Sequence, residues 1–223
     1  FGAVLGEHVE PRAPSWAKRE ATRGPDAPLS ALYPTMATIA EELVERARRG
    51  TLPGVVGDPL SMRAERERLD RKPRASIVLV GPSGCGKTSW VRLLARHLLQ
   101  ERRRTKRETR LWSTSGDRIL SGMIWLGQWQ QRVLRMIDEL DGEDDLLHVD
   151  RLGTLTRELG DGGSIADMLV PALGVGSIQM ITEATPAEWE RVQARHPALA
   201  GVLTPIRLAS TTSAEMPELL RHY

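Results

Sequence analysis

The sequence predicts an open, mostly parallel α/β sheet, and two observations lead to this fold class. First, residues 75–80 form a β-branched apolar run that leads through a glycine-rich loop, 81–88, into residues 89–99, where apolar residues recur with helical spacing. Second, later apolar runs alternate with helical patterns, which is typical of strands joined by crossover helices. In such a sheet a ligand binds at the carboxyl ends of the strands.

The remaining elements follow in chain order. Residues 1–28 hold several prolines among scattered charges and indicate a linker or an N-terminal arm. Helices are expected over 32–49, from apolar residues on one face, and over 61–74, which is dense in charge. Further strands are expected at 111–114, 146–150, 177–182 and 206–208, and further helices at 128–140, 164–173 and 186–195. One α/β domain is therefore predicted over 29–210.

The glycine-rich loop reads Gly-Pro-Ser-Gly-Cys-Gly-Lys-Thr and matches the phosphate-loop pattern between a strand and a helix. Its glycines let several backbone N–H groups point at one anion, and the helix N-terminus adds a partial positive charge. Lys87 is expected to reach the β- and γ-phosphates of ATP, and the Thr88 hydroxyl to ligate Mg²⁺. The predicted loop contacts to the nucleotide are Gly81, Pro82, Ser83, Gly84, Cys85, Gly86, Lys87, Thr88 and Ser89.

An ATPase of this kind also needs an acid at the end of a neighbouring strand to hold the Mg²⁺ shell, and usually a second acid beside it that orients the attacking water. Two positions compete for these roles. Asp150 ends the apolar run 146–150 and is followed by Arg151, whereas Asp138 and Glu139 lie in a segment of helical spacing. Periodicity favours Asp150 as the Mg²⁺ acid. Because a guanidinium cannot polarise water as a carboxylate does, Arg151 predicts slow or absent hydrolysis with binding retained.

The composition argues against several other functions. A net charge of +2, from well-mixed charges of both signs, gives no argument for a nucleic-acid partner, and the basic run 102–110 indicates an exposed helix end. A single cysteine, Cys85, excludes an internal disulfide and is typical of a reducing compartment. No apolar run approaches the ~20 residues that span a bilayer, so a cytoplasmic protein without membrane attachment is expected. Phe1 and the absence of a basic leader predict part of a longer protein rather than a signal peptide.

Together these features resemble the first ATPase domain of Clp-type AAA+ unfoldases and disaggregases, from about residue 43 to residue 220. The resemblance implies a three-layer α/β/α P-loop fold. Residues 43–57 look like the family's leading helix and adenine-contacting turn, so Val55 and Val56 would flank the base. The family's helical lid would begin near residue 213, so the range 211–223 is expected to hold only the start of a truncated lid.

The resemblance also implies roles for three residues beyond the phosphate loop. Trp125, in a glycine-bracketed segment, takes the place of the pore-loop aromatic that grips polypeptide in a central channel. Thr185 takes the place of the polar residue that senses the γ-phosphate, with Thr182 as the second choice. The implied catalytic residues are Lys87, Asp150 and Thr185, and the implied metal ligands are Thr88 and Asp150.

The sequence departs from the family pattern at two catalytic positions. Arg151 stands where the family has its catalytic glutamate, and no arginine follows Leu199 where the inter-subunit arginine finger is expected, although Arg195 and Arg207 lie nearby. The implied function is therefore an ATP-binding module of a Clp-like protein-remodelling assembly, a hexamer-like homo- or hetero-oligomeric ring with a polypeptide substrate and impaired ATP hydrolysis. The alternative is a pseudo-ATPase that binds nucleotide as a structural assembly module without turnover.

Overall fold

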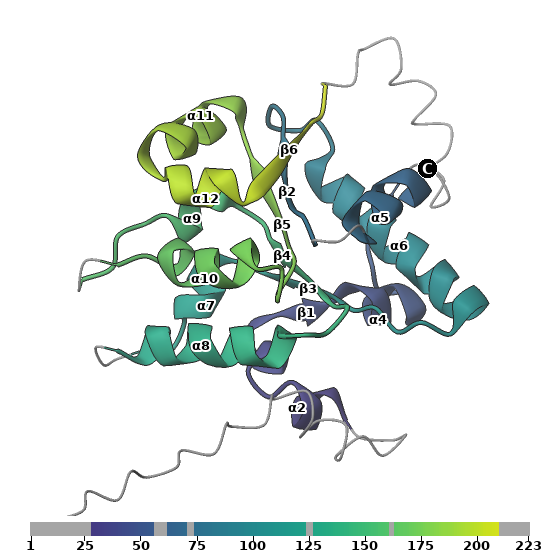
Figure 1. Ribbon diagram of the computed structural model, residues 1–223. Coiled ribbons are helices and arrows are strands. Elements are labelled where there is room, and N and C mark those ends of the chain that lie inside the picture. The colour runs from purple at the N-terminus through teal and green to yellow at the C-terminus, as the bar shows by residue number, and fades with distance from the viewer. Residues whose placement is uncertain (1–27, 56–61, 71–73, 124–126, 161–162, 210–223) are drawn as a thin grey trace, which may run out of the picture.

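The computed structural model describes residues 28–55, 62–70, 74–123, 127–160 and 163–209. These residues form a three-layer α/β/α arrangement around one sheet (Figure 1). The strands are β1 (Glu41–Glu42), β2 (Ser76–Val80), β3 (Leu111–Thr114), β4 (Leu146–Val149), β5 (Met180–Ala184) and β6 (Leu203–Arg207), in the sheet order β1-β3-β4-β5-β2-β6. Only β1 pairs antiparallel among the described strands, so the predicted mostly parallel sheet is confirmed.

Helices cover both faces of the sheet. On one face lie α4 (Leu43–Arg48), α5 (Arg63–Asp70) and α6 (Lys87–Thr105), and on the other lie α8 (Gln128–Leu140), α10 (Ile165–Gly174) and α12 (Pro197–Gly201) (Figure 1). The other described helices are α2 (Leu29–Leu32), α3 (Met36–Ile39), α7 (Gly116–Leu120), α9 (Leu152–Leu155) and α11 (Pro186–Arg195). Because both faces are covered, the central strands are buried throughout, and most of their side chains are apolar.

Two hydrophobic clusters, one on each face, hold the layers together. On β2, Ile77 and Leu79 pack with the cluster that includes Leu94 of α6. Val78 and Val80 alternate with them and pack with the cluster that includes Val133 of α8 and parts of α10. This alternation fixes which strand side chains point toward α6 and which point away from it.

The predicted helix over 32–49 is wrong, because the segment is divided into α3, β1 and α4. Ala40 is extended, and Glu42 pairs with Trp112 of β3 in the sheet. The buried carboxylate of Glu42 accepts hydrogen bonds from the backbone N–H groups of Val44 and Glu45, so it caps a new helix there. Burial raises the pKa of this carboxyl above its usual value. A buried cap of this kind overrides the helical spacing of the apolar residues.

The predicted strand over 177–182 is displaced, because β5 spans Met180–Ala184 instead. The Ser177 carbonyl accepts a hydrogen bond from the backbone N–H of Gly142, and residues 175–178 form a turn and a bend before the strand. Similarly, β6 begins at Leu203, before its predicted range. The short helices α7, α9 and α12 were not predicted, since each is too short to show periodicity. The displacement of β5 places Glu183 inside a strand.

Several predictions lie outside the described residues. These are the arm over 1–28, apart from Pro28, the start of a lid over 211–223, and the positions of Val56 and Trp125. Within the described part of the chain, no helix combines the length and apolarity that a membrane span requires.

Glu139, one of the competing acids, has a structural role on α8. Its carboxylate is only 6% exposed and accepts hydrogen bonds from the backbone N–H groups of Thr35, at 2.7 Å, and Met36, at 2.9 Å. It therefore fixes the N-terminus of α3 against α8. Its neighbour Asp138 is exposed on the same helix.

Replacing Glu139 tests this structural role. Glu139→Ala leaves two backbone N–H groups without their acceptor, so we expect the free energy of unfolding to fall by about 1–3 kcal/mol. Nucleotide affinity should not change. Urea denaturation measures the first quantity, and Glu190→Ala, at an exposed position of α11, is the control, with an expected change of less than about 0.5 kcal/mol. A folded Glu139→Ala protein that fails to bind nucleotide would contradict this assignment and make Glu139 a candidate for the nucleotide site.

Candidate nucleotide-binding site

A cleft of about 410 Å³ opens at the carboxyl ends of β2, β4 and β5. It is lined by Ser83, Gly84, Gly86, Lys87, Thr88, Ser89, Asp150, Arg151, Glu183, Ala184, Thr185 and Glu188. The structure therefore brings the predicted phosphate loop together with Asp150 and Thr185, although these come from three separate parts of the chain. A larger cavity of about 790 Å³ lies beside α8, but the phosphate loop does not contribute to it.

The phosphate loop presents its backbone to this cleft. Gly84, with φ +81°, and Gly86, with φ +92°, adopt left-handed conformations that residues with side chains rarely accept. Gly86 is also the N-cap of α6, so the first N–H groups of a 19-residue helix face the cleft. Backbone N–H groups at a helix N-terminus favour bound phosphate.

Gly81 begins the loop where the neighbouring strand β6 ends. Its N–H donates to the Ala184 carbonyl at 3.1 Å, which ties the loop to β5. A Cβ atom at this position would lie 2.5 Å from Cys85 Sγ and 2.7 Å from the Leu208 carbonyl oxygen. Cys85 therefore fills a tight space inside the loop, as expected for a small loop residue. Any residue larger than glycine at position 81 would therefore displace the neighbouring backbone.

Lys87 and Thr88 open α6 at the floor of the cleft. The Lys87 ammonium donates to the carbonyl oxygens of Gly81 and Pro82, each at 2.8 Å, so its positive charge lies at the loop itself. The Thr88 hydroxyl Oγ1 lies 3.2 Å from both carboxylate oxygens of Glu183. Glu183 is a site residue that the sequence interpretation missed, because its strand was predicted to end one residue earlier.

Asp150 follows β4 and lines the cleft, as predicted for the Mg²⁺ acid. Its N–H donates to the Thr114 carbonyl at 3.2 Å, which continues the sheet pairing past the strand end. Its carboxylate oxygen Oδ1 is buried and has no hydrogen-bond partner among the described residues. An unpartnered buried carboxylate oxygen is costly unless a cation or donor completes it.

Arg151 also lines the cleft, at the N-cap of α9, but its guanidinium turns to the surface. Its side chain is 63% exposed, and Nη2 lies 3.5 Å from Asp117 Oδ2. Arg157 binds the other oxygen of the same carboxylate at 3.1 Å. No carboxylate therefore stands directly after Asp150, where one would orient water.

Thr185 lines the cleft as the N-cap of α11. Its hydroxyl accepts from the Glu188 backbone N–H at 3.2 Å and donates to the Glu188 carboxylate at 2.9 Å. Hydrogen bonds from the Thr185 backbone and hydroxyl lower the pKa of Glu188, with burial acting in the opposite direction. Thr182, the second choice for the sensor, is fully buried and does not line the cleft.

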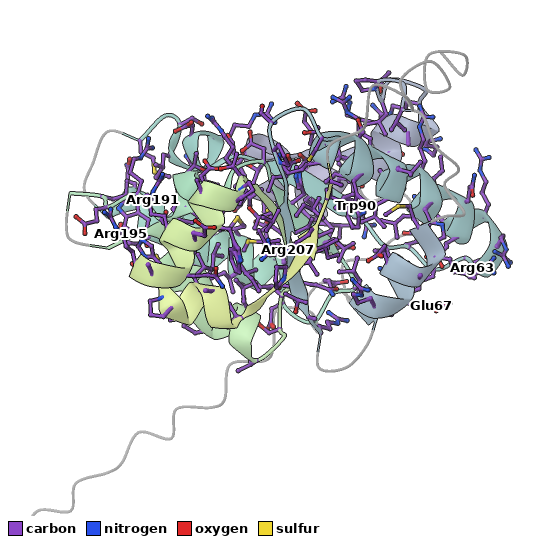
Figure 2. All side chains as sticks on the ribbon, turned by 90° about the horizontal axis from the view of Figure 1, so that it is seen from above. Arg63, Glu67, Trp90, Arg191, Arg195 and Arg207 are labelled. Carbon is purple, nitrogen blue, oxygen red and sulfur yellow. The ribbon has the colours of Figure 1, made fainter. Side chains whose placement is uncertain are left out.

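The other predicted site residues lie away from the cleft or outside the described residues. Val55 is half-buried and does not line the cleft. Gly201 ends α12 without an arginine beside it. Figure 2 shows Arg195 near Arg191 at the outer edge of the molecule, and Arg207 on β6. Both arginines considered for the finger are exposed, and neither lines the cleft of this chain.

Comparisons with known proteins agree with this geometry. A family profile described as "ATPase family associated with various cellular activities (AAA)" matches residues 77–178. The chain is 29% identical over 192 residues to the ATP-dependent Clp protease ATP-binding subunit ClpC of Staphylococcus epidermidis, covering 84% of this chain and 24% of that protein. It is 26% identical over 195 residues to the chaperone protein ClpB of Oceanobacillus iheyensis, covering 86% of this chain and 24% of that protein.

Solved structures show the same fold. The S. cerevisiae Hsp104:casein complex in its extended conformation superposes with a TM-score of 0.72, at 22% identity, over 84% of this chain and 33% of that chain. The S. cerevisiae Hsp104-ADP complex superposes with a TM-score of 0.71, at 22% identity, over 84% and 27%. The chain spans about a quarter of the length of the curated relatives it matches.

The fold is that of an AAA+ P-loop ATPase domain, since the family profile matches residues 77–178 and the Hsp104 structures superpose over 84% of this chain. Within this class, the chain resembles the ATPase domains of Clp-type unfoldases and disaggregases.

A substitution at Gly81 tests whether nucleotide binding depends on the geometry of the phosphate loop. Gly81→Ala forces a Cβ atom against Cys85 and Leu208, so we expect at least tenfold weaker binding of a fluorescent ATP analogue, with a loss of about 1–3 kcal/mol in stability. Titration and thermal melts measure the two effects. Gly201→Ala is the control, because nothing lies within 4 Å of its Cβ position. Unchanged binding by Gly81→Ala would contradict the assignment of the loop.

Proposed function

We propose that residues 29–210 are a Mg²⁺-ATP-binding AAA+ domain that acts within a Clp-like protein-remodelling assembly. One observation carries this proposal: a single cleft joins the glycine loop and Lys87 to Thr88, Asp150 and Thr185. The loop would hold the phosphates through its backbone and Lys87. Val55 and Val56 are proposed to flank the adenine, and Thr185 to sense the γ-phosphate, on the resemblance alone.

The donor atoms in the cleft fit Mg²⁺. Thr88 offers a hydroxyl oxygen, and the buried oxygen of Asp150 lacks a partner among the described residues. Mg²⁺ prefers oxygen ligands and is commonly held by one or two carboxylates together with substrate phosphates. The described residues contain no group of three or more His, Cys, Asp or Glu that could hold a metal by itself. Thr88 and Asp150 would hold the ion, which would neutralise phosphate charge.

The proposed partners come from the relatives. Solved Hsp104 structures include complexes with casein, and the ClpC relatives are ATP-binding subunits of a protease. For this chain we propose assembly into a hexamer-like ring, with other copies or related subunits, and Trp125 as the contact to an extended polypeptide. We propose no nucleic-acid partner, and the cytoplasmic location remains a prediction.

Turnover is proposed to be slow. Arg151 pairs with Asp117 at the surface, so the position after Asp150 supplies no carboxylate to orient water. An arginine finger contributes roughly 10³–10⁵ to the rate in related chemistry, and the sequence has none beside Gly201. The same observations favour the alternative, a pseudo-ATPase whose bound nucleotide holds an assembly together without turnover.

Restoring the acid separates these two functions. In Arg151→Glu a carboxylate stands beside Asp150, and we expect steady-state ATP hydrolysis by the full chain to rise about ten- to a hundredfold. Phosphate release is measured against Lys87→Ala as the blank. Arg157→Glu is the matched control, because Arg157 shares the Asp117 partner and does not line the cleft.

The outcomes are distinct. A rise in Arg151→Glu but not in Arg157→Glu locates the defect at position 151. Saturable nucleotide binding with no turnover above the blank, in wild type and in Arg151→Glu alike, establishes the pseudo-ATPase. Turnover that is above the blank and equal in wild type and Arg151→Glu would contradict the proposed role of Arg151.

A further inference from the structure

Glu183 is a buried carboxylate at the nucleotide site for which the phosphate-loop motif gives no role. Its side chain is 8% exposed and both of its oxygens lie 3.2 Å from the Thr88 hydroxyl. Thr88 is the loop residue expected to ligate Mg²⁺. The carboxylate therefore contacts the group that would hold the metal.

The sheet determines this placement. In β5, Glu183 is paired with Leu79 of β2, and β5 lies between β2 and β4. The neighbouring residue Ile181 packs in the cluster that contains α6, and residues two apart on a strand share a face. Glu183 thus points toward α6 near the carboxyl end of β5, beneath the first turn of that helix. A one-residue change of register would remove it from the site.

His148 of β4 supports the carboxylate from the other side. Its Nε2 lies 3.3 Å from Glu183 Oε1, and its Nδ1 lies 2.9 Å from the Ser113 hydroxyl of β3. A carboxylate accepts hydrogen bonds, so Nε2 is the nitrogen that donates, and in neutral histidine Nδ1 then accepts from Ser113. A polar chain therefore runs across the buried sheet from Ser113 through His148 and Glu183 to Thr88.

The negative charge of Glu183 is not balanced by a cationic side chain among the described residues. Among the described residues, no lysine or arginine forms an ion pair with Glu183, whose partners are the Thr88 hydroxyl and the His148 ring. Asp150, in the same cleft, has a buried oxygen without a partner. A buried carboxylate and a half-buried one beside a phosphate site would repel ATP, unless a cation lies with them. Mg²⁺ held by Thr88 would supply that cation.

We propose that Glu183, positioned by His148, is a second carboxylate of the Mg²⁺ shell. It accepts the hydrogen bond of the Thr88 hydroxyl, so that the hydroxyl oxygen is turned to the metal, and it makes ATP binding dependent on Mg²⁺. This inference rests on the proposed nucleotide site and adds a positioning residue to it.

The test measures how strongly Mg²⁺ and nucleotide binding are coupled. A fluorescent ATP analogue is titrated into the full chain in Mg²⁺ and in EDTA. The Kd in EDTA divided by the Kd in Mg²⁺ gives the coupling ratio. In Glu183→Gln we expect this ratio to fall at least tenfold. The Kd in EDTA should stay equal or become tighter, because a negative charge near the phosphates has been removed. Glu190→Gln, exposed on α11, is the matched control and should keep the wild-type ratio.

A double-mutant cycle links the effect to Thr88. Thr88→Val removes the hydroxyl that Glu183 contacts, so adding Glu183→Gln to it should lower the ratio no further. If Glu183→Gln does not fold, as judged by its thermal melt, Glu183→Asp replaces it, since that carboxylate is one methylene shorter and cannot reach Thr88 without movement. Its ratio should fall as well.

Several results would overturn the proposal. An unchanged coupling ratio in a folded Glu183 variant would overturn it. Equally weakened binding of the analogue in Mg²⁺ and in EDTA would show that Glu183 has a structural role alone. A normal ratio with abolished turnover would make Glu183 a water-orienting group instead. If the wild type binds no more analogue than Lys87→Ala, the proposed nucleotide site itself is wrong. If the wild type binds the analogue and the coupling ratio does not depend on Glu183, only the proposal for Glu183 is wrong.

Discussion

The parallel pairing of β5 with β2 on one side and β4 on the other is the constraint on which the site depends. It aligns the carboxyl ends of three strands that are far apart in the sequence. The phosphate loop leaves β2, Asp150 leaves β4, and Glu183 and Thr185 come from the end of β5. Helices pack against both faces of these strands, so a one-residue slip would move each side chain to the opposite face and take Glu183 away from α6.

The separation of binding from hydrolysis follows from where charges stand at this edge of the sheet. Lys87 and the N-terminus of α6 favour phosphate, whereas Asp150 and Glu183 favour a cation beside it. The position that would orient water holds Arg151, whose guanidinium binds Asp117 at the surface. Groups that would bind Mg²⁺-ATP are thus present together, while the group that would activate water is absent from its expected position among the described residues.

The sequence predicted the features whose signals are local. The phosphate loop is contiguous, and Asp150 follows a clear apolar run, so both could be placed from the sequence alone. Glu183 could not, because its role depends on the register of β5 and on contacts to Thr88 and His148 from other elements. The division of the segment 32–49 likewise depends on the buried Glu42 cap and on sheet pairing, which periodicity does not contain.

Equilibrium dialysis of ATP against the full chain measures whether this cleft binds Mg²⁺-ATP. We expect saturation near one ATP per chain in Mg²⁺, weaker binding in EDTA, and loss of binding in Lys87→Ala. Saturation far below one per chain, or the same binding in Lys87→Ala as in wild type, would contradict this expectation.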